Sequence, residues 1–242
     1  MGKLIETNRS LIVSADLDTS KECNTLAKTL SGVLGIGGFK VGITAGLDGL
    51  YHSVNALRYG FGKKTVIIYD HQKAGTDIPD MGVKFAQKLK ACGCDAAILF
   101  PFAGPATQTA WTKACQDAGL CVIVGSVMTH PEFLESEGGY ISDMAPQRIF
   151  ELACDLGVRD FVVPGTKITW VKQLRALLDD RLGAGEFDLY APGFVTQGGD
   201  ITDCGKAAGS RFHPIVGSGI YGQATPEARR AAAQTITQKL AA

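Results

Sequence analysis

Charged side chains of opposite sign follow one another in one short segment of the first third of the chain. Asp70 comes directly after an apolar run, Lys73 lies three residues further on, and Asp77 four residues after that. Two carboxylates and an ammonium group are costly to bury unless they pair with one another. The segment therefore predicts an alternating network of charges, with unrelated ion pairs and helix caps as the alternative interpretation.

Other polar residues occupy similar places along the chain. Asp16 follows one apolar run, Lys40 lies within the next, Thr129 follows a later run, and Pro192 and Gln197 follow another. In a barrel of parallel strands the active site lies at the carboxyl ends of the strands. We therefore expect these side chains to converge at one end of the fold.

The apolar runs themselves predict the strands. They are mostly continuous rather than alternating, which is typical of parallel strands that are covered on both faces. Amphipathic segments separate them, and eight such units in 242 residues match a (β/α)8 barrel, whereas an open doubly wound sheet usually has five or six strands. We predict an α/β fold, a TIM barrel, forming a single domain over residues 1–242. The expected strands are Leu11–Ala15, Ile36–Val41, Thr65–Tyr69, Asp95–Phe100, Leu120–Gly125, Asp160–Val163, Phe187–Tyr190 and His213–Val216.

Two helices carry clear start signals. Thr19 and Glu22 form a capping box before a stripe of apolar residues at helical spacing, which runs from Cys23 to Leu34. Thr225, followed by a proline and a glutamate, predicts the start of the last helix.

Glycines gather after the last two expected strands. One loop contains Gly198 and Gly199, and the other runs from Gly217 through Ser218 to Gly222. Glycines let backbone N–H groups approach phosphate oxygens, and these two loops commonly bind phosphate in barrels. The second loop also matches G-x-G-x-x-G, but only 20 residues follow it, too few for a dinucleotide-binding βαβ unit. Plain turn glycines are the alternative.

Composition narrows the function classes. The 24 basic and 24 acidic side chains balance, which argues against nucleic acid and anionic membranes as partners. Seven scattered cysteines, with no C-x-x-C pair, suggest reduced thiols rather than a zinc site. No signal peptide or membrane span is evident, so we expect a cytoplasmic protein.

The chain resembles the orotidine 5′-monophosphate decarboxylase suprafamily, whose members are barrels. The resemblance extends from Leu11 to Gly217. Its most specific segments are Asp77-Ile78-Pro79, Met128-Thr129-His130-Pro131 and the ten residues from Ala191 to Asp200, which include Gln197-Gly198-Gly199.

The resemblance implies loss of CO2 from C6 of orotidine 5′-monophosphate, a step of pyrimidine synthesis that gives uridine 5′-monophosphate without a metal or organic cofactor. It also implies that Lys73 stabilises the C6 carbanion and then protonates it, and that Asp77 reaches into the neighbouring subunit's site, so the protein would be a homodimer. The implied catalytic residues are Lys40, Asp70, Lys73 and Asp77, and the implied substrate-binding residues are Asp16, Ile78, Thr129, Pro192, Gln197, Gly217 and Ser218.

The chain departs from the family motif at three places. The family's Asp-x-Lys-x-x-Asp becomes Asp70-x-x-Lys73-x-x-x-Asp77, and residues three apart on a strand do not share a face. Ser218 occupies the position of the family's phosphate-binding arginine, for which Arg211 is a candidate substitute, and Met81 replaces a usual threonine.

Two further interpretations therefore stay open: a Mg²⁺-dependent sugar-phosphate decarboxylase or aldolase of the same suprafamily, and a non-catalytic nucleotide-binding relative. His71 is expected either to stay protonated among the carboxylates or to serve the structure of the turn. His130 is expected to shape its loop.

Overall fold

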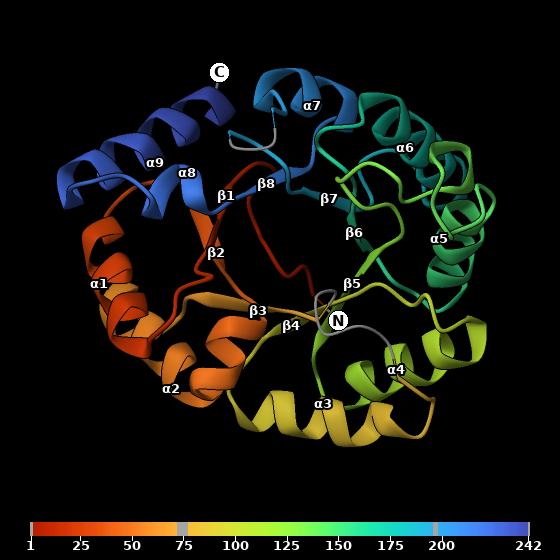
Figure 1. Ribbon diagram of the computed structural model, residues 1–242, viewed down its shortest axis with the longest axis horizontal. Helices are drawn as coiled ribbons and strands as arrows, with labels where there is room; N and C mark the ends of the chain where they lie inside the picture. The colour runs from red at the N-terminus through yellow and green to blue at the C-terminus, as the bar shows by residue number, and fades with distance from the viewer. Residues whose placement is uncertain (1, 72–76, 196–197, 242) are drawn as a thin grey trace.

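Eight parallel strands form a closed barrel in the computed structural model, which describes residues 2–71, 77–195 and 198–241. The strands pair in sequence order, and β8 pairs with β1 to close the ring. Figure 1 looks along the barrel and shows the helices as an outer ring. The α/β TIM (β/α)8 barrel is thus confirmed over the open sheet.

The strands lie within a residue or two of the expected ranges. They are β1 Leu11–Ser14, β2 Ile36–Val41, β3 Val66–Asp70, β4 Ala96–Leu99, β5 Cys121–Gly125, β6 Asp160–Val162, β7 Asp188–Ala191 and β8 Phe212–Val216. The α-helices are α1 Ser20–Leu30, α2 Ile43–Phe61, α3 Met81–Ala91, α4 Pro105–Asp117, α5 Ala145–Asp155, α6 Ile168–Leu182, α7 Ile201–Ala208, α8 Ser218–Tyr221 and α9 Pro226–Ala241, and a short 3-10 helix spans Glu135–Glu137.

Two layers of apolar side chains explain why the strands read as continuous apolar runs. Ile12 and Ile68 point into the barrel, where they belong to a core that fills its interior. Their neighbours Val13 and Ile67 point outward and pack in the layer between strands and helices. Because alternate residues of a strand face opposite sides, both faces must be apolar when both are buried.

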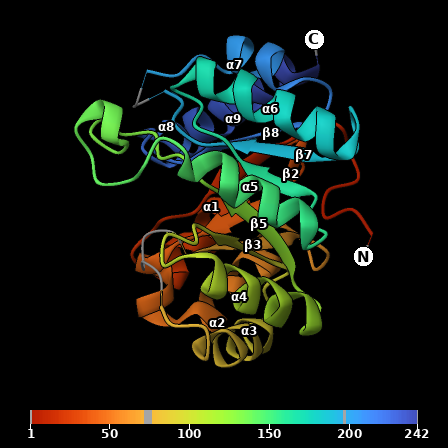
Figure 2. The ribbon, with the colours of Figure 1, turned by 90° about the vertical axis from the view of Figure 1, so that its right-hand side faces the viewer.

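The two ends of the barrel differ. The loop that follows β5 projects from one end, and the N-terminal segment lies at the other (Figure 2). Ile5 is buried against the interior core, and Arg211, just before β8, donates hydrogen bonds to the Ile5 carbonyl (2.9 Å) and to Asn8 Oδ1 (2.7 Å). The N-terminal segment therefore closes the amino end of the barrel.

Buried polar side chains lie at this amino end, at or next to the starts of the strands. Asp188 contacts both Arg211 and the His213 ring at 2.8 Å, and Tyr190 donates its hydroxyl to Asp160 Oδ1 at 3.0 Å. Burial, followed by the nearby Asp188 charge, raises the pKa of Asp160 to about 6. This group lies at the opposite end from the loops that were expected to carry function.

The predicted starts of α1 and α9 are confirmed, but the prediction that Leu34 is a core residue is wrong. Thr19 and Glu22 form a reciprocal capping box, and Thr225 Oγ1 accepts from the Ala228 amide at 3.2 Å. The first apolar stripe, however, ends earlier than expected: α1 stops at Leu30, and Leu34 is 88% exposed. The cause is Gly32, whose φ of +78° turns the chain away from the helix axis.

The seven cysteines are all unpaired. Within the described residues, no helix combines the length and the apolar character that crossing a bilayer requires.

Candidate active site

A cavity of about 570 Å³ opens at the carboxyl end of the barrel. Seven of the residues expected to form the site line it, and they come from the ends of six different strands. They are Asp16, Lys40, Asp70, Thr129, Pro192, Gly217 and Ser218.

Lys40 joins two carboxylates at the base of this cavity. Its Nζ donates to Asp70 Oδ2 at 2.7 Å and to Asp16 Oδ2 at 3.0 Å. Lys40 lies on β2, Asp70 ends β3, and Asp16 stands two residues beyond β1. The barrel thus brings together three charges that are up to 54 residues apart in sequence.

These charges are removed from water. Lys40 is 5% exposed and Asp70 is fully buried. Burial alone would lower the pKa of Lys40, but the charges of Asp70 and Asp16 outweigh that effect, and the pKa of Lys40 is raised. The ammonium group therefore stays charged at neutral pH and fixes both carboxylates.

Two residues that determine the position of the Asp16 carboxylate were not predicted from the sequence. Ser14 Oγ donates to Asp16 Oδ2 at 2.8 Å. A Cβ at Gly42 would lie only 2.5 Å from Asp16 Oδ1, so the carboxylate fits because position 42 has no side chain. The signal that could have found them is their position, since both lie at or just beyond the carboxyl end of a strand next to a charged residue.

The last two loops form one wall of the cavity. Within the loop after β7, Phe194 forms an isolated β-bridge with Gly199. The two loops approach each other closely, because a Cβ at Gly219 would lie 3.0 Å from the Val195 side chain. The short helix α8 begins at Ser218, with Gly217 as its N-cap. Because glycines and a helix start let backbone amides approach an anion, this wall suits a group such as phosphate, although the Ile220 and Tyr221 amides already donate to the Gly217 carbonyl.

Tyr221 adds a phenol to the same wall and was missed by sequence reasoning. Burial, and then the charge of Asp16, raises the pKa of Tyr221. The hydroxyl is protonated at neutral pH and can donate a hydrogen bond into the cavity.

The prediction that Arg211 could replace a phosphate-binding arginine at position 218 is wrong. It is buried at the amino end of the barrel, where it pairs with Asp188 at 2.8 Å. A residue that precedes a strand lies at the opposite end from the residues that follow it, so Arg211 has no access to the cavity.

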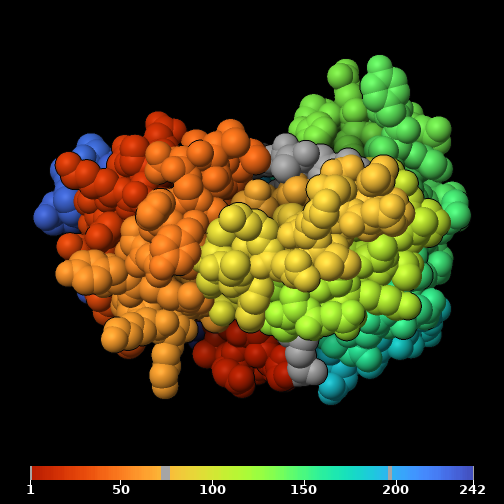
Figure 3. Space-filling model, turned by 90° about the horizontal axis from the view of Figure 1, so that it is seen from below, coloured from red at the N-terminus to blue at the C-terminus, as the bar shows by residue number. Residues whose placement is uncertain are grey.

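The loop after β5 forms a second wall. Thr129 and His130 line the cavity, and the Thr129 carbonyl accepts from Thr166 Oγ1 at 3.0 Å. Further along, Lys167 Nζ contacts Glu137 Oε1 at 2.6 Å and ties the projecting part of the loop to the segment before α6. Figure 3 shows this loop standing above the neighbouring surface at the upper right. His130 therefore belongs to the cavity lining as well as to the loop.

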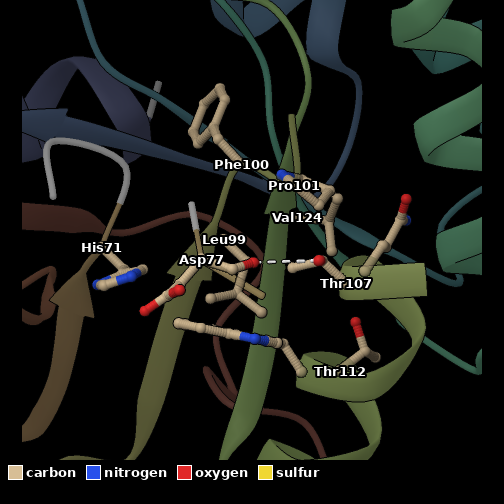
Figure 4. A pocket seen from close by; sticks show the side chains of 10 residues that line it. His71, Asp77, Leu99, Phe100, Pro101, Thr107, Thr112 and Val124 are labelled. Carbon is tan, nitrogen blue, oxygen red and sulfur yellow. Dashed lines mark hydrogen bonds between the residues drawn. The ribbon is translucent and has the colours of Figure 1, made fainter. Parts of the chain in front are cut away.

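Asp77 and Ile78 do not line the cavity of their own chain. Asp77 lines a small pocket beside α4 together with His71 and Thr107, and Figure 4 shows the Thr107 hydroxyl directed toward Asp77. The Ile78 side chain is 60% exposed. Lys73 and Gln197 lie outside the described residues.

His71 faces away from the cavity. Its ring centroid lies 4.5 Å from that of Phe85 and 5.2 Å from that of Trp111. Burial lowers the pKa of His71 and outweighs the opposing charges of Asp70 and Asp77. Of the two interpretations of His71, the lowered pKa argues against a protonated ring among carboxylates and leaves the structural role, because desolvation dominates over its acidic neighbours.

The Lys40 ammonium group lies between the buried carboxylate of Asp70 and the half-buried carboxylate of Asp16. Among the described residues, no group of three or more histidine, cysteine, aspartate or glutamate side chains has the arrangement of a metal site. Asp16 and Asp70 instead share the Lys40 ammonium.

Comparison with known proteins identifies relatives over the whole barrel. A family model described as "Orotidine 5'-phosphate decarboxylase / HUMPS family" matches residues 9–234. Orotidine 5'-phosphate decarboxylase of Methanosarcina mazei is 27% identical over 230 residues, which are 92% of each chain. The enzyme of that name from Methanosarcina barkeri is 31% identical over 173 residues, 69% of this chain and 71% of the relative.

Solved structures share the fold. Orotidine 5'-monophosphate decarboxylase from Methanocaldococcus jannaschii, complexed with the inhibitor BMP, superposes with a TM-score of 0.80 at 21% identity, covering 96% of this chain and 98% of the other. Orotidine 5'-phosphate decarboxylase from Pyrococcus horikoshii gives a TM-score of 0.74 at 26% identity, covering 96% and 100%.

Proposed function

Because the chain belongs to the orotidine 5'-phosphate decarboxylase / HUMPS family, we propose that it converts orotidine 5'-monophosphate to uridine 5'-monophosphate and CO2. The observation that carries this proposal is the triad of Asp16 with the buried Lys40 and Asp70 at the base of the cavity. A fixed set of charges in a site shielded from water stabilises charge that develops in a transition state.

In the proposed reaction the bond between C6 and the carboxylate carbon breaks, and CO2 leaves. The electron pair stays on C6, Lys73 stabilises this carbanion and transfers its ammonium proton to it, and the amine regains a proton from water. Asp70 stands beside the departing carboxylate, and Lys40 holds Asp70 in place through the 2.7 Å contact. No step of this scheme requires a metal.

The rest of the substrate occupies the two walls. Asp16 and Lys40 bind the ribose hydroxyls, and Thr129 addresses the edge of the base. Gly217, Ser218 and the first turn of α8 bind the phosphate, while Pro192 and Gln197 come from the loop after β7. Binding energy from a remote phosphate is available for loop closure and orientation.

The proposed active form is a homodimer in which Asp77 and Ile78 complete the partner's site. Exposure supports this proposal, since Ile78, Met81 and Leu47 are apolar and lie at the surface. Met81 shares a groove with Asp77 and with Leu50 on α2. Exposed apolar side chains gathered on one face are typical of an interaction surface.

A hybrid dimer tests this arrangement. Asp77→Ala and Lys40→Met chains are each expected to be nearly inactive, because each variant lacks one part of every site. Mixing them allows a heterodimer in which one site has both Lys40 from its own chain and Asp77 from the other. Recovery of a part of the wild-type rate after mixing supports the proposal, and no recovery in a mixture shown to exchange subunits contradicts it.

A chelator distinguishes the proposed reaction from the Mg²⁺-dependent reaction on a sugar phosphate. The triad favours the metal-independent reaction, because the Lys40 ammonium already occupies the position between the two carboxylates. Turnover of orotidine 5′-monophosphate that survives excess chelator supports the proposed function. Activity restored only by Mg²⁺ with a sugar phosphate contradicts it, and nucleotide binding without turnover identifies a non-catalytic relative.

A further inference from the structure

The backbone of His71 extends β3 by one residue beyond the catalytic carboxylate. Its N–H donates to the Ile98 carbonyl at 3.2 Å, next to the β3–β4 pair Asp70–Ile98. Because successive residues of a strand face opposite sides, Asp70 points into the barrel and His71 points toward the helices. The position of the imidazole and the direction of the Asp70 side chain are therefore set together.

The imidazole lies against two aromatic rings from different helices. Phe85 belongs to α3 and Trp111 to α4, and their rings stack on each other with centroids 4.8 Å apart. Trp111 is buried, and a Cβ at Gly82 would lie only 2.9 Å from its Cδ1. The backbone of α3 thus packs directly on the indole, which leaves this ring little room to move.

The same tryptophan also holds the far end of the connection between β3 and α3. Its Nε1 donates to the Ile78 carbonyl at 3.0 Å. One turn earlier on α4, Thr107 Oγ1 donates to the Asp77 carbonyl at 3.1 Å (Figure 4). One indole therefore contacts His71 with its ring and Ile78 with its N–H.

We propose that Trp111 and His71 form a clamp that positions Asp70 for the site of its own chain and Asp77 for the site of the partner, so that both aromatic residues are positioning residues for the reaction. This inference rests on the proposed function. In sequence the segment between the two aspartates is longer than the family motif, and closing a longer connection costs more conformational entropy. Fixing both ends on one buried ring offsets that cost, and an error of about 1 Å in the position of a reacting group can reduce a rate about a hundredfold.

Four variants test the clamp by steady-state kinetics on the full-length protein. His71→Ala removes the ring and is expected to lower kcat about tenfold to a hundredfold, with a smaller effect on KM. His71→Phe keeps the aromatic contacts and is expected to retain kcat within about threefold. Trp111→Phe keeps an aromatic ring but loses the N–H to Ile78 and part of the ring, and should lower kcat, while Trp170→Phe, the same change at the other tryptophan, should not.

The comparison of the two His71 variants decides the kinetic arm. A kcat for His71→Ala close to that of the wild type, measured well below its melting temperature, overturns the clamp. A His71→Phe variant that folds but loses as much kcat as His71→Ala overturns it as well, because the aromatic packing would then be irrelevant. If the alanine variant does not fold, Trp111→Phe against Trp170→Phe provides the same decision.

Hydrogen exchange provides a readout that does not depend on the substrate. In the absence of ligand, the amides of residues 77–82 should exchange faster in His71→Ala and Trp111→Phe than in the wild type, while those of β7 stay unchanged. Unchanged exchange at 77–82 overturns the clamp. A wild-type protein that exchanges as expected but releases no CO2 overturns the proposed function instead, so that the two failures are distinguishable.

Discussion

Replacing Lys40 by methionine should destabilise the fold and abolish activity together. The variant keeps most of the aliphatic stem and removes the ammonium group that contacts Asp70 at 2.7 Å and Asp16 at 3.0 Å. Because Asp70 is fully buried, its carboxylate cannot recover this interaction from water. Removing one partner of a buried ion pair costs about 3–5 kcal/mol.

That cost is large enough to measure by thermal and urea unfolding. For a chain of this length, about 3–5 kcal/mol corresponds to a fall in melting temperature of about 6–20 °C. The pKa of Lys40 is raised above its ordinary value of 10.5, so the stability that its charge contributes is fully present below that pH and is lost only above it. The contribution of the Lys40 charge to the stability of the wild type should therefore not change around neutral pH.

Two controls identify the cause. Lys172→Met makes the same change at an exposed position of α6 and should alter the melting temperature little. The double variant Lys40→Met, Asp70→Asn removes the buried carboxylate charge as well, and should regain much of the stability but none of the activity. A double variant no more stable than Lys40→Met, or a Lys40→Met protein as stable as the wild type, would show that the buried Asp70 charge does not depend on Lys40.

Three other substitutions test separate parts of the protein. Asp160→Asn should flatten the pH dependence of stability. Because the pKa of Asp160 is raised from 3.8 to about 6 in the folded protein, the wild type should lose about 3 kcal/mol of its free energy of unfolding as the pH rises through this range. Urea unfolding at acidic and neutral pH should show this loss only in the wild type. Gly42→Ala should raise KM and lower kcat, since a Cβ 2.5 Å from Asp16 Oδ1 displaces that carboxylate; unchanged kinetics would count against the role of Asp16. Ser218→Arg should lower KM and make it more sensitive to salt by placing a cation at the phosphate wall, and an unchanged KM would show that the phosphate binds elsewhere.

The barrel could be predicted from the apolar runs of its strands, and the Asp16–Lys40–Asp70 triad from the positions of these residues at strand ends. Parallel strands buried on two faces leave a plain apolar signal, and their carboxyl ends must meet on one rim. Asp16, Lys40 and Asp70 each lie at or near such an end, so their convergence required only the correct strand count. Ser14 contacts Asp16 two residues further along the chain, whereas the closeness of Gly42 to Asp16 depends on how β1 and β2 lie side by side, which no local pattern contains.

Other features could not be predicted because burial decides them. His71 stands between acidic residues in sequence, yet its ring packs on Phe85 and Trp111, and desolvation outweighs the charges. Leu34 continues an apolar stripe, but Gly32 ends its helix first. The cytoplasmic location, the single domain over residues 1–242, the homodimer and the catalytic and binding roles of the site residues, Lys73 and Gln197 among them, stay predictions.

The central claim is that this barrel decarboxylates orotidine 5′-monophosphate through its own charged side chains. The most direct test is CO2 release from orotidine 5′-monophosphate by the purified protein after exhaustive treatment with a chelator, with Lys73→Ala measured beside the wild type. Turnover by the wild type that the chelator does not change, and its loss in Lys73→Ala, is the predicted result. No CO2 release from this nucleotide by the folded wild type, or an undiminished rate in Lys73→Ala, would contradict it.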